Sequence, residues 1–237
     1  MDIFGTPPST DNLSDLGLKE ISKVHWNISP SALTEITLQK GMGRMASSGA
    51  LAINTGKFTG RSPKDRFIVK DQITQDAVWW GDINIPFEER NFDGIYDKMM
   101  SYFKGKEIYV RDAYACSLPE YQLNLRVINE FPWSNQFASN MFIDPKSEDL
   151  NHFSPEWHII NAPGFVANPD EDGTRQENFA IINFTKKMIL IGGTGYTGEI
   201  KKGIFSVLNF VLPHQKNTLS MHCSANLGKD GDTAIFF

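Results

Sequence analysis

The feature that most constrains the fold is a glycine-rich stretch between an apolar run and a helical pattern. Residues 187–191 read Lys-Met-Ile-Leu-Ile, which is typical of a strand, and four glycines follow within 192–198. Apolar residues then recur at helical spacing until Pro213, where we expect the helix to stop. Glycines let a backbone turn tightly and bring its N–H groups close to a ligand. The pattern predicts a strand-to-helix junction suited to an anionic, oxygen-rich ligand.

Polar side chains cluster just after this turn. Tyr196, Lys201 and Lys202 supply a hydroxyl and two amines, and His222 follows in a second motif, Met-His-Cys-Ser-Ala-Asn. Taken singly, a lysine pair is usually a solvated helix face, and a lone histidine is more often partly buried than a ligand. Only the joint pattern makes these residues candidates for a site.

A dinucleotide-binding site is the alternative interpretation of the glycines. Residues 193–198 formally fit G-x-G-x-x-G, but that fingerprint requires an acidic residue about 20 positions later to hold the ribose. No Asp or Glu occurs between Glu199 and Asp230. We therefore do not expect a nicotinamide dehydrogenase.

A second motif places an arginine in a glycine-punctuated loop. Residues 54–69 read Asn-Thr-Gly-Lys-Phe-Thr-Gly-Arg-Ser-Pro-Lys-Asp-Arg-Phe-Ile-Val, with strand-like stretches at 50–54 and 67–69. The planar guanidinium of Arg61 suits a carboxylate, which it can bind through two hydrogen bonds. Alone, Arg61 is equally well an ordinary loop cation.

Together the motifs resemble ATP-type phosphoenolpyruvate carboxykinase. The resemblance covers nearly the whole chain, and the matching segments, all in the family's order, are 25–27 (His-Trp-Asn), 59–65, 140–143, 177–179, 192–203 and 221–226. It implies a mixed α/β fold with flanking helices. It also implies an enzyme of gluconeogenesis that converts oxaloacetate and ATP to phosphoenolpyruvate, carbon dioxide and ADP.

The resemblance assigns roles residue by residue. Arg61 matches the arginine that holds the substrate carboxylate, and Tyr196 matches a tyrosine near the substrate and carbon dioxide. Lys202 and His222 match two protein ligands of Mn²⁺ that also lie close to the nucleotide's phosphoryl group, while Mg²⁺ accompanies ATP. An amine ligates a metal only without its proton, so we expect the pKa of Lys202 to lie below its ordinary value of about 10.4.

The family's phosphate-binding loop has no counterpart in these 237 residues. The segment 232–237 matches the strand that leads into that loop, and G-x-x-x-x-G-K-[ST] occurs nowhere in the sequence. We expect an N-terminal portion, with a substrate- and metal-binding domain at 1–215, the start of a nucleotide-binding domain at 216–237, and no turnover by this chain alone. The alternative is a stand-alone module that binds a dicarboxylate without catalysis.

The composition of the chain limits its expected cellular location and the classes of partner that it could bind. The net charge of −5 weighs against a nucleic-acid partner. Cys116 and Cys223 form neither a C-x-x-C pair nor a disulfide framework, which favours the reduced cytoplasm. The first ten residues lack a secretory pattern and no run of 18 apolar residues occurs, so we expect no membrane association.

The remaining periodicities predict a mixed sheet. A helix capped by Ser29 or Ser31 is expected through Leu33 to Leu38, and an apolar stripe from Phe92 to Phe103 predicts a second helix that faces the core. Strands are expected at 108–115, 123–128, 157–160, 179–184, 188–191, 219–223 and 233–237. Because strands outnumber helices without regular alternation, we expect a mixed-sheet α/β architecture.

Overall fold

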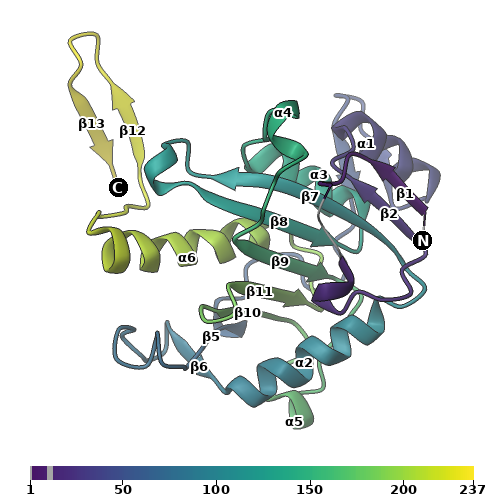
Figure 1. Cartoon of the computed structure of the whole chain (residues 1–237), viewed down its shortest axis with the longest axis horizontal. Coiled ribbons are helices and arrows are strands. Elements are labelled where there is room, and N and C mark those ends of the chain that lie inside the picture. The colour runs from purple at the N-terminus through teal and green to yellow at the C-terminus, as the bar shows by residue number, and fades with distance from the viewer. Residues whose placement is uncertain (1, 10–12) are drawn as a thin grey trace.

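A nine-stranded mixed sheet forms the centre of the molecule (Figure 1). The computed structural model describes residues 2–9 and 13–237. From edge to edge the strands are β1 (Asp2–Gly5), β2 (Lys23–Trp26), β7 (Glu107–Ala115), β8 (Leu123–Asn129), β9 (Trp157–Ala162), β11 (Met188–Gly192), β10 (Phe179–Asn183), β5 (Arg66–Val69) and β6 (Ile85–Phe87). This arrangement confirms the expected mixed α/β class.

Two small hairpins and several helices surround the sheet. The hairpins are β3 (Gly43–Met45) with β4 (Leu51–Ile53), and β12 (Ser224–Leu227) with β13 (Thr233–Phe236). The α-helices are α1 (Pro30–Gln39), α2 (Glu89–Tyr102), α3 (Pro132–Met141), α4 (Ser147–Leu150), α5 (Pro169–Asp172) and α6 (Gly198–Lys216). Short 3₁₀ helices span Leu13–Leu16, Pro63–Asp65 and Pro119–Tyr121. The β12–β13 hairpin projects away from the rest of the molecule (Figure 1).

The strand directions bring three loops to one edge of the sheet. Strands β8, β9 and β11 are neighbours and run parallel, whereas β7 pairs with β8 and β10 pairs with β11 in antiparallel fashion. The carboxyl ends of β8, β9 and β11 therefore lie side by side. Ligands of open α/β sheets commonly bind beyond such ends.

Both faces of the sheet are buried. In β11, Met188 and Leu190 belong to a core cluster with the apolar stripe of α2, whereas Ile189 and Ile191 pack in a second cluster with Ile200, Ile204, Val207 and Val211 of α6. Alternate residues of a strand point to opposite faces, so α2 and α6 cover opposite sides. A strand buried on both faces reads as one continuous apolar run, as 188–191 does.

Most of the expected elements are present. Ser29 is the N-cap of α1, and its hydroxyl oxygen accepts a hydrogen bond from the Ala32 N–H at 3.2 Å. The stripe predicted to face the core does so: Phe92, Ile95, Met99, Met100 and Phe103 are all buried. The predicted strands at 108–115, 123–128, 157–160, 179–184, 188–191 and 233–237 correspond to β7, β8, β9, β10, β11 and β13.

Two predictions about the end of α6 are wrong. The helix does not stop at Pro213 but continues to Lys216, because Pro213 lies in the last turn and Asn217, in the left-handed conformation at φ 50°, closes the helix instead. Residues 219–223 form no strand: they connect α6 to β12 and pair with no other strand, and Leu219 is 78% exposed. Strand-like composition alone does not supply a pairing partner.

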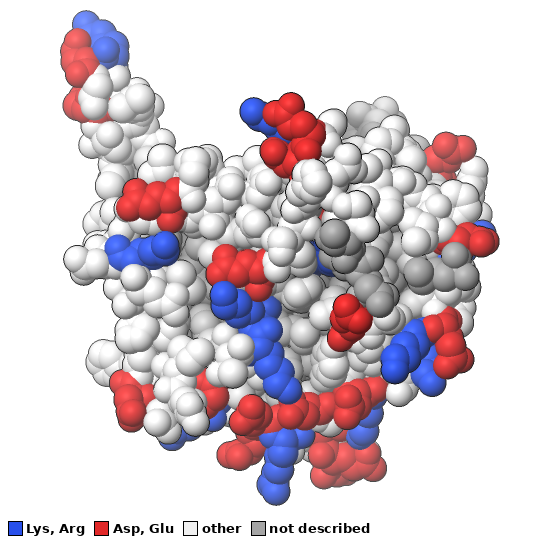
Figure 2. Space-filling model, in the orientation of Figure 1, with Lys and Arg blue, Asp and Glu red and all other residues white. Residues whose placement is uncertain are grey.

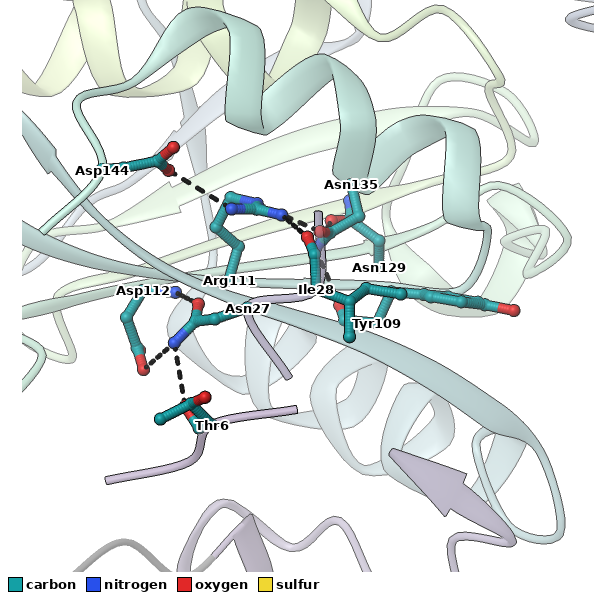
Figure 3. Close-up of polar contacts among 9 residues, drawn as sticks. All are labelled: Thr6, Asn27, Ile28, Tyr109, Arg111, Asp112, Asn129, Asn135 and Asp144. Atoms are coloured by element: carbon teal, nitrogen blue, oxygen red, sulfur yellow. Dashed lines mark hydrogen bonds and ion pairs between the residues drawn. The ribbon is translucent and has the colours of Figure 1, made fainter. Parts of the chain in front are cut away.

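A buried polar network fastens the N-terminal segment to the sheet (Figure 3). The Asp112 carboxylate accepts hydrogen bonds from Trp26 Nε1 at 2.7 Å and from Arg126 Nε at 2.7 Å. Asn27 accepts from the Asp112 N–H at 2.8 Å and donates to the Thr6 carbonyl at 3.2 Å. Arg111, also buried, donates to the Ile28 carbonyl at 2.5 Å, and burial lowers the pKa of its guanidinium. Because the buried charges of Asp112 and Arg126 are paired with each other, we assign this region a structural role and not a ligand-binding one.

The surface carries both signs of charge. Figure 2 shows Lys and Arg side chains interspersed with Asp and Glu over the face in view, without one large field of either sign. Each helix in the described part of the chain is too short or too polar to cross a bilayer. Cys116 and Cys223 are both free thiols.

Candidate active site

The glycine turn after β11 is wedged between two other loops. Gly193 has φ 68°, and a Cβ added there would lie 2.5 Å from the Glu177 carbonyl oxygen. A Cβ on Gly195 would lie 2.6 Å from the Thr55 carbonyl oxygen. Real side chains do not tolerate such contacts, so glycine is required at both positions for the backbones to approach. The turn thereby holds the 54–65 loop against the start of α6.

The loop that carries Arg61 is anchored at its base. Buried Asp65 accepts two hydrogen bonds from the guanidinium of Arg175, both at 2.8 Å, and one from Gln176 at 2.7 Å. The Thr194 hydroxyl donates to the Phe58 carbonyl at 3.3 Å. Arg61 lies between these anchors and is exposed. Its side chain is therefore free to meet a ligand while its backbone is held in place.

A buried ion pair joins β5 to the first turn of α6. Arg66 donates to Glu199 through Nε at 2.6 Å and through Nη2 at 2.8 Å, and Glu199 is only 3% exposed. The hydrogen bonds that Arg66 donates to this carboxylate raise the pKa of its guanidinium. A negative charge in the first turn also interacts favourably with the helix dipole. Neither residue was predicted as part of the site from the sequence, in which Glu199 was the only signal, as the one acidic residue of the otherwise cationic 192–203 motif.

Lys202 lies in the cationic part of the site. Burial lowers the pKa of its amine, and the positive charges of Arg61, Arg66 and Lys201 lower it further, while Glu199 acts in the opposite direction. The fold thus places Lys202 within the electrostatic influence of Arg61, although the two residues are 141 positions apart in the sequence. The lowered pKa agrees with the expectation for an amine that gives its lone pair to a metal.

His222 and Lys202 lie against the same aromatic ring. The Lys202 amine is 5.2 Å from the centroid of the Phe205 ring, and the His222 ring is 5.0 Å from it. His222 is exposed and belongs to the bend after α6. Phe205 was not predicted as part of the site from the sequence, where its position one helical turn after Lys202 was the only signal.

Tyr196 belongs to the turn itself. Its N–H donates to the Thr194 hydroxyl at 3.1 Å, and its ring packs on Gly198, where an added Cβ would lie 2.5 Å from the ring. Tyr196 therefore lies within the glycine turn, two residues before the start of α6.

A cavity of about 670 Å³ opens beside these residues. Lys202, Arg66 and Glu199 line it together with apolar side chains from α6 and the 77–84 loop. Arg61, Tyr196 and His222 are not among its lining residues. Of the four predicted residues, Lys202 alone lines this cavity.

The donor set fits a metal ion in part. An amine with a lowered pKa and an imidazole are both suitable nitrogen donors. Within residues 2–9 and 13–237, no group of three or more His, Cys, Asp and Glu side chains is arranged to hold a metal ion. Lys202 and His222 thus offer two nitrogen donors beside the same Phe205 ring.

Comparison with known proteins assigns the family. Residues 22–237 match the family model described as phosphoenolpyruvate carboxykinase. Phosphoenolpyruvate carboxykinase (ATP) of Christiangramia forsetii is 63% identical over 96% of this chain and 43% of its own length; that of Flavobacterium johnsoniae is 60% identical over 95% and 42%. The protein of the same name from Amoebophilus asiaticus is 47% identical over 100% of this chain and 46% of its own length.

The chain spans less than half the length of these relatives, which is consistent with the N-terminal portion that the order of the motifs indicates. The match to the family model covers nearly all of the sequence, including the Arg61 loop, the glycine turn and the His222 motif. The chain belongs to the ATP-type phosphoenolpyruvate carboxykinase family.

Proposed function

We propose that this chain supplies the carboxylate- and metal-facing part of an enzyme that makes phosphoenolpyruvate from oxaloacetate and ATP in gluconeogenesis. The observation that carries the proposal is the set of cationic groups at the start of α6, where Arg61, Arg66 and Lys201 all depress the pKa of Lys202. The charge of Arg66 is met by Glu199, so Arg61, Lys201 and Lys202 supply the positive charge for an anionic ligand.

The reaction explains the need for positive charge. The bond between C3 of oxaloacetate and its departing carboxylate breaks, and the electron pair left behind forms an enolate. The enolate oxygen then attacks the γ-phosphorus of ATP, and the bond to ADP breaks. Negative charge develops on the enolate and on the transferring group, so preorganised cations stabilise both stages.

Each residue has a role in this scheme. Arg61 grips the substrate carboxylate through its guanidinium. Tyr196 lies near the substrate and the released carbon dioxide. Lys202 and His222 would hold Mn²⁺ through nitrogen, and Mg²⁺ would accompany ATP. When bound, the manganese would supply Lewis-acid stabilisation of enolate and phosphate oxygens.

The proposal also covers the domain boundary, the activity and the location of the chain. The boundary between domains lies at residues 215 and 216, which is supported by the end of α6 at Lys216 and by the projection of β12–β13 from the molecule (Figure 1). The phosphate-binding loop is not among the 237 residues, so this chain alone performs no turnover. The free thiols agree with the reducing cytoplasm as its location, and no nucleic acid is required as a partner.

Calorimetric titration with oxalate, an analogue of the enolate, tests the proposal. We expect oxalate to bind more tightly with Mn²⁺ present, and Arg61→Gln to weaken binding at least tenfold. The matched control is Arg90→Gln, which removes an exposed arginine from α2 and leaves binding unchanged. Oxalate affinity that is indifferent to Mn²⁺ would favour a dicarboxylate-binding module instead. An oxalate affinity that Arg61→Gln leaves unchanged would refute both the enzyme proposal and the dicarboxylate-binding module.

A further inference from the structure

A second cavity, of about 310 Å³, lies at the carboxyl ends of the three parallel strands β8, β9 and β11. Phe131, Gly164 and Gly193, which line it, each follow one of these strands by one or two residues. It shares no lining residue with the larger cavity beside Lys202. Its position is the one at which open α/β sheets usually bind a small molecule.

Aromatic rings form one wall of this cavity. The rings of Phe131 and Trp133 stack at 5.5 Å with an interplanar angle of 25°. Trp133 is 8% exposed and therefore held by packing, while Phe58 contributes a third ring. Val166, which is 57% exposed, stands at the rim. Flat apolar walls of this kind favour a planar ring as the ligand.

The floor of the cavity is already formed. The Gly164 N–H donates to Glu130 Oε2 at 2.8 Å, and the Tyr102 hydroxyl donates to Glu130 Oε1 at 2.6 Å. A Cβ on Gly164 would lie 2.3 Å from the Tyr102 hydroxyl oxygen, so the backbone is packed directly on this pair. A ligand would not need to reorganise the floor in order to bind.

Two opposite charges lie at the mouth. Lys57 Nζ contacts Glu177 Oε2 at 2.7 Å, and these side chains are 71% and 47% exposed. An ammonium group has three donors and a carboxylate has about four acceptor sites, so one shared hydrogen bond leaves capacity on both. The pair therefore presents one positive and one negative charge to a ligand. A head group with both charges complements it better than an anion or a cation alone.

We propose that this cavity binds a small aromatic molecule with a dipolar head group, of the chemical class of an aromatic α-amino acid. The ring packs against Phe131 and Trp133, the carboxylate meets Lys57, and the ammonium meets Glu177. The cavity borders the glycine turn and the 54–58 segment of the Arg61 loop, but the proposal does not rest on the proposed reaction.

Titration of the ¹⁵N-labelled chain with L-phenylalanine, followed by NMR, tests the site. We expect saturable shifts of the Gly56, Gly164 and Gly195 amides and of the Trp133 indole N–H. Glycine carries only the head group and benzyl alcohol carries the ring without charges. Each should bind at least about tenfold more weakly than L-phenylalanine, because each lacks one set of contacts.

Two variants make the test specific. Val166→Trp fills the rim and should abolish the shifts, whereas Leu118→Trp, at a site 55% exposed and outside the cavity, should leave them unchanged. Lys57→Gln should weaken L-phenylalanine roughly two- to fivefold and leave benzyl alcohol unaffected. Lys57 is exposed, so this variant decides the matter if Val166→Trp fails to fold. The proposal is overturned by absent saturation, by shifts at other residues, or by L-phenylalanine binding that is indifferent to Lys57→Gln.

Discussion

Replacing Glu199 with glutamine tests the ion pair that joins β5 to α6. The variant keeps the shape of the side chain but removes its charge and turns an amide N–H₂ toward one donor of Arg66. Glu199 Oε1 and Oε2 accept from Arg66 at 2.8 and 2.6 Å, and the two side chains are 4% and 27% exposed.

The loss of stability follows from this burial. Hydrogen bonds to charged groups contribute about 1.5–3 kcal/mol each, and removing one partner of a fully buried pair costs about 3–5 kcal/mol. Because Arg66 retains some contact with water, we expect a loss of about 2–3 kcal/mol. At roughly 2–4 °C per kcal/mol for a chain of this size, the melting temperature should fall by about 4–12 °C.

Urea unfolding and calorimetry of Glu199→Gln provide the measurement. The matched control is Glu177→Gln, which makes the same change in a pair with Lys57 whose members are 71% and 47% exposed. An exposed pair contributes about 0–1 kcal/mol, so the control should lose little. Equal losses in the two variants, or a loss below about 0.5 kcal/mol in Glu199→Gln, would refute the importance of this pair.

Two further predictions concern the neighbouring charges. The fold lowers the pKa of Lys202 from 10.5, so the protonated amine is disfavoured in the native state. Lys202→Met should therefore have a higher free energy of unfolding than the wild type at pH 8. This difference in stability should shrink as the pH rises toward 10.5, because the native amine then loses its proton. Urea midpoints across this range measure the effect, and an advantage that grows with pH would contradict it. Asp65→Asn removes the charge that holds Arg175 and should cost about 1–3 kcal/mol of unfolding free energy. Lys64→Gln, next to it and exposed, is the control in thermal unfolding, and equal melting temperatures of the two variants would count against the anchor.

Local patterns in the sequence were sufficient to predict much of the fold. The stripe from Phe92 to Phe103 predicts α2 because its apolar residues recur at helical spacing and therefore lie on one face of the helix. The run 188–191 predicts β11 because a strand buried on both faces is apolar at every position. The wrong prediction of a strand at 219–223 shows that local composition does not determine which segments pair. The composition of these residues resembles that of a strand, but pairing depends on a neighbouring edge that no local pattern reveals.

The site was predictable only as separate residues. The motifs identified Arg61, Tyr196, Lys202 and His222, but the pairing of Arg66 with Glu199 joins positions 133 residues apart. Phe205, which lies between Lys202 and His222, looks like any apolar residue of an amphipathic helix. Such contacts arise from the packing of α6 on the sheet and have no local signature.

Mn²⁺ titration followed by electron paramagnetic resonance tests whether Lys202 is a metal ligand. We expect weak, saturable binding by the wild type, its loss in Lys202→Arg because a guanidinium does not give up its proton, and its retention in Lys201→Arg. Undiminished Mn²⁺ affinity in Lys202→Arg, or no saturable binding by the wild type, would contradict the assignment of Lys202 as a metal ligand.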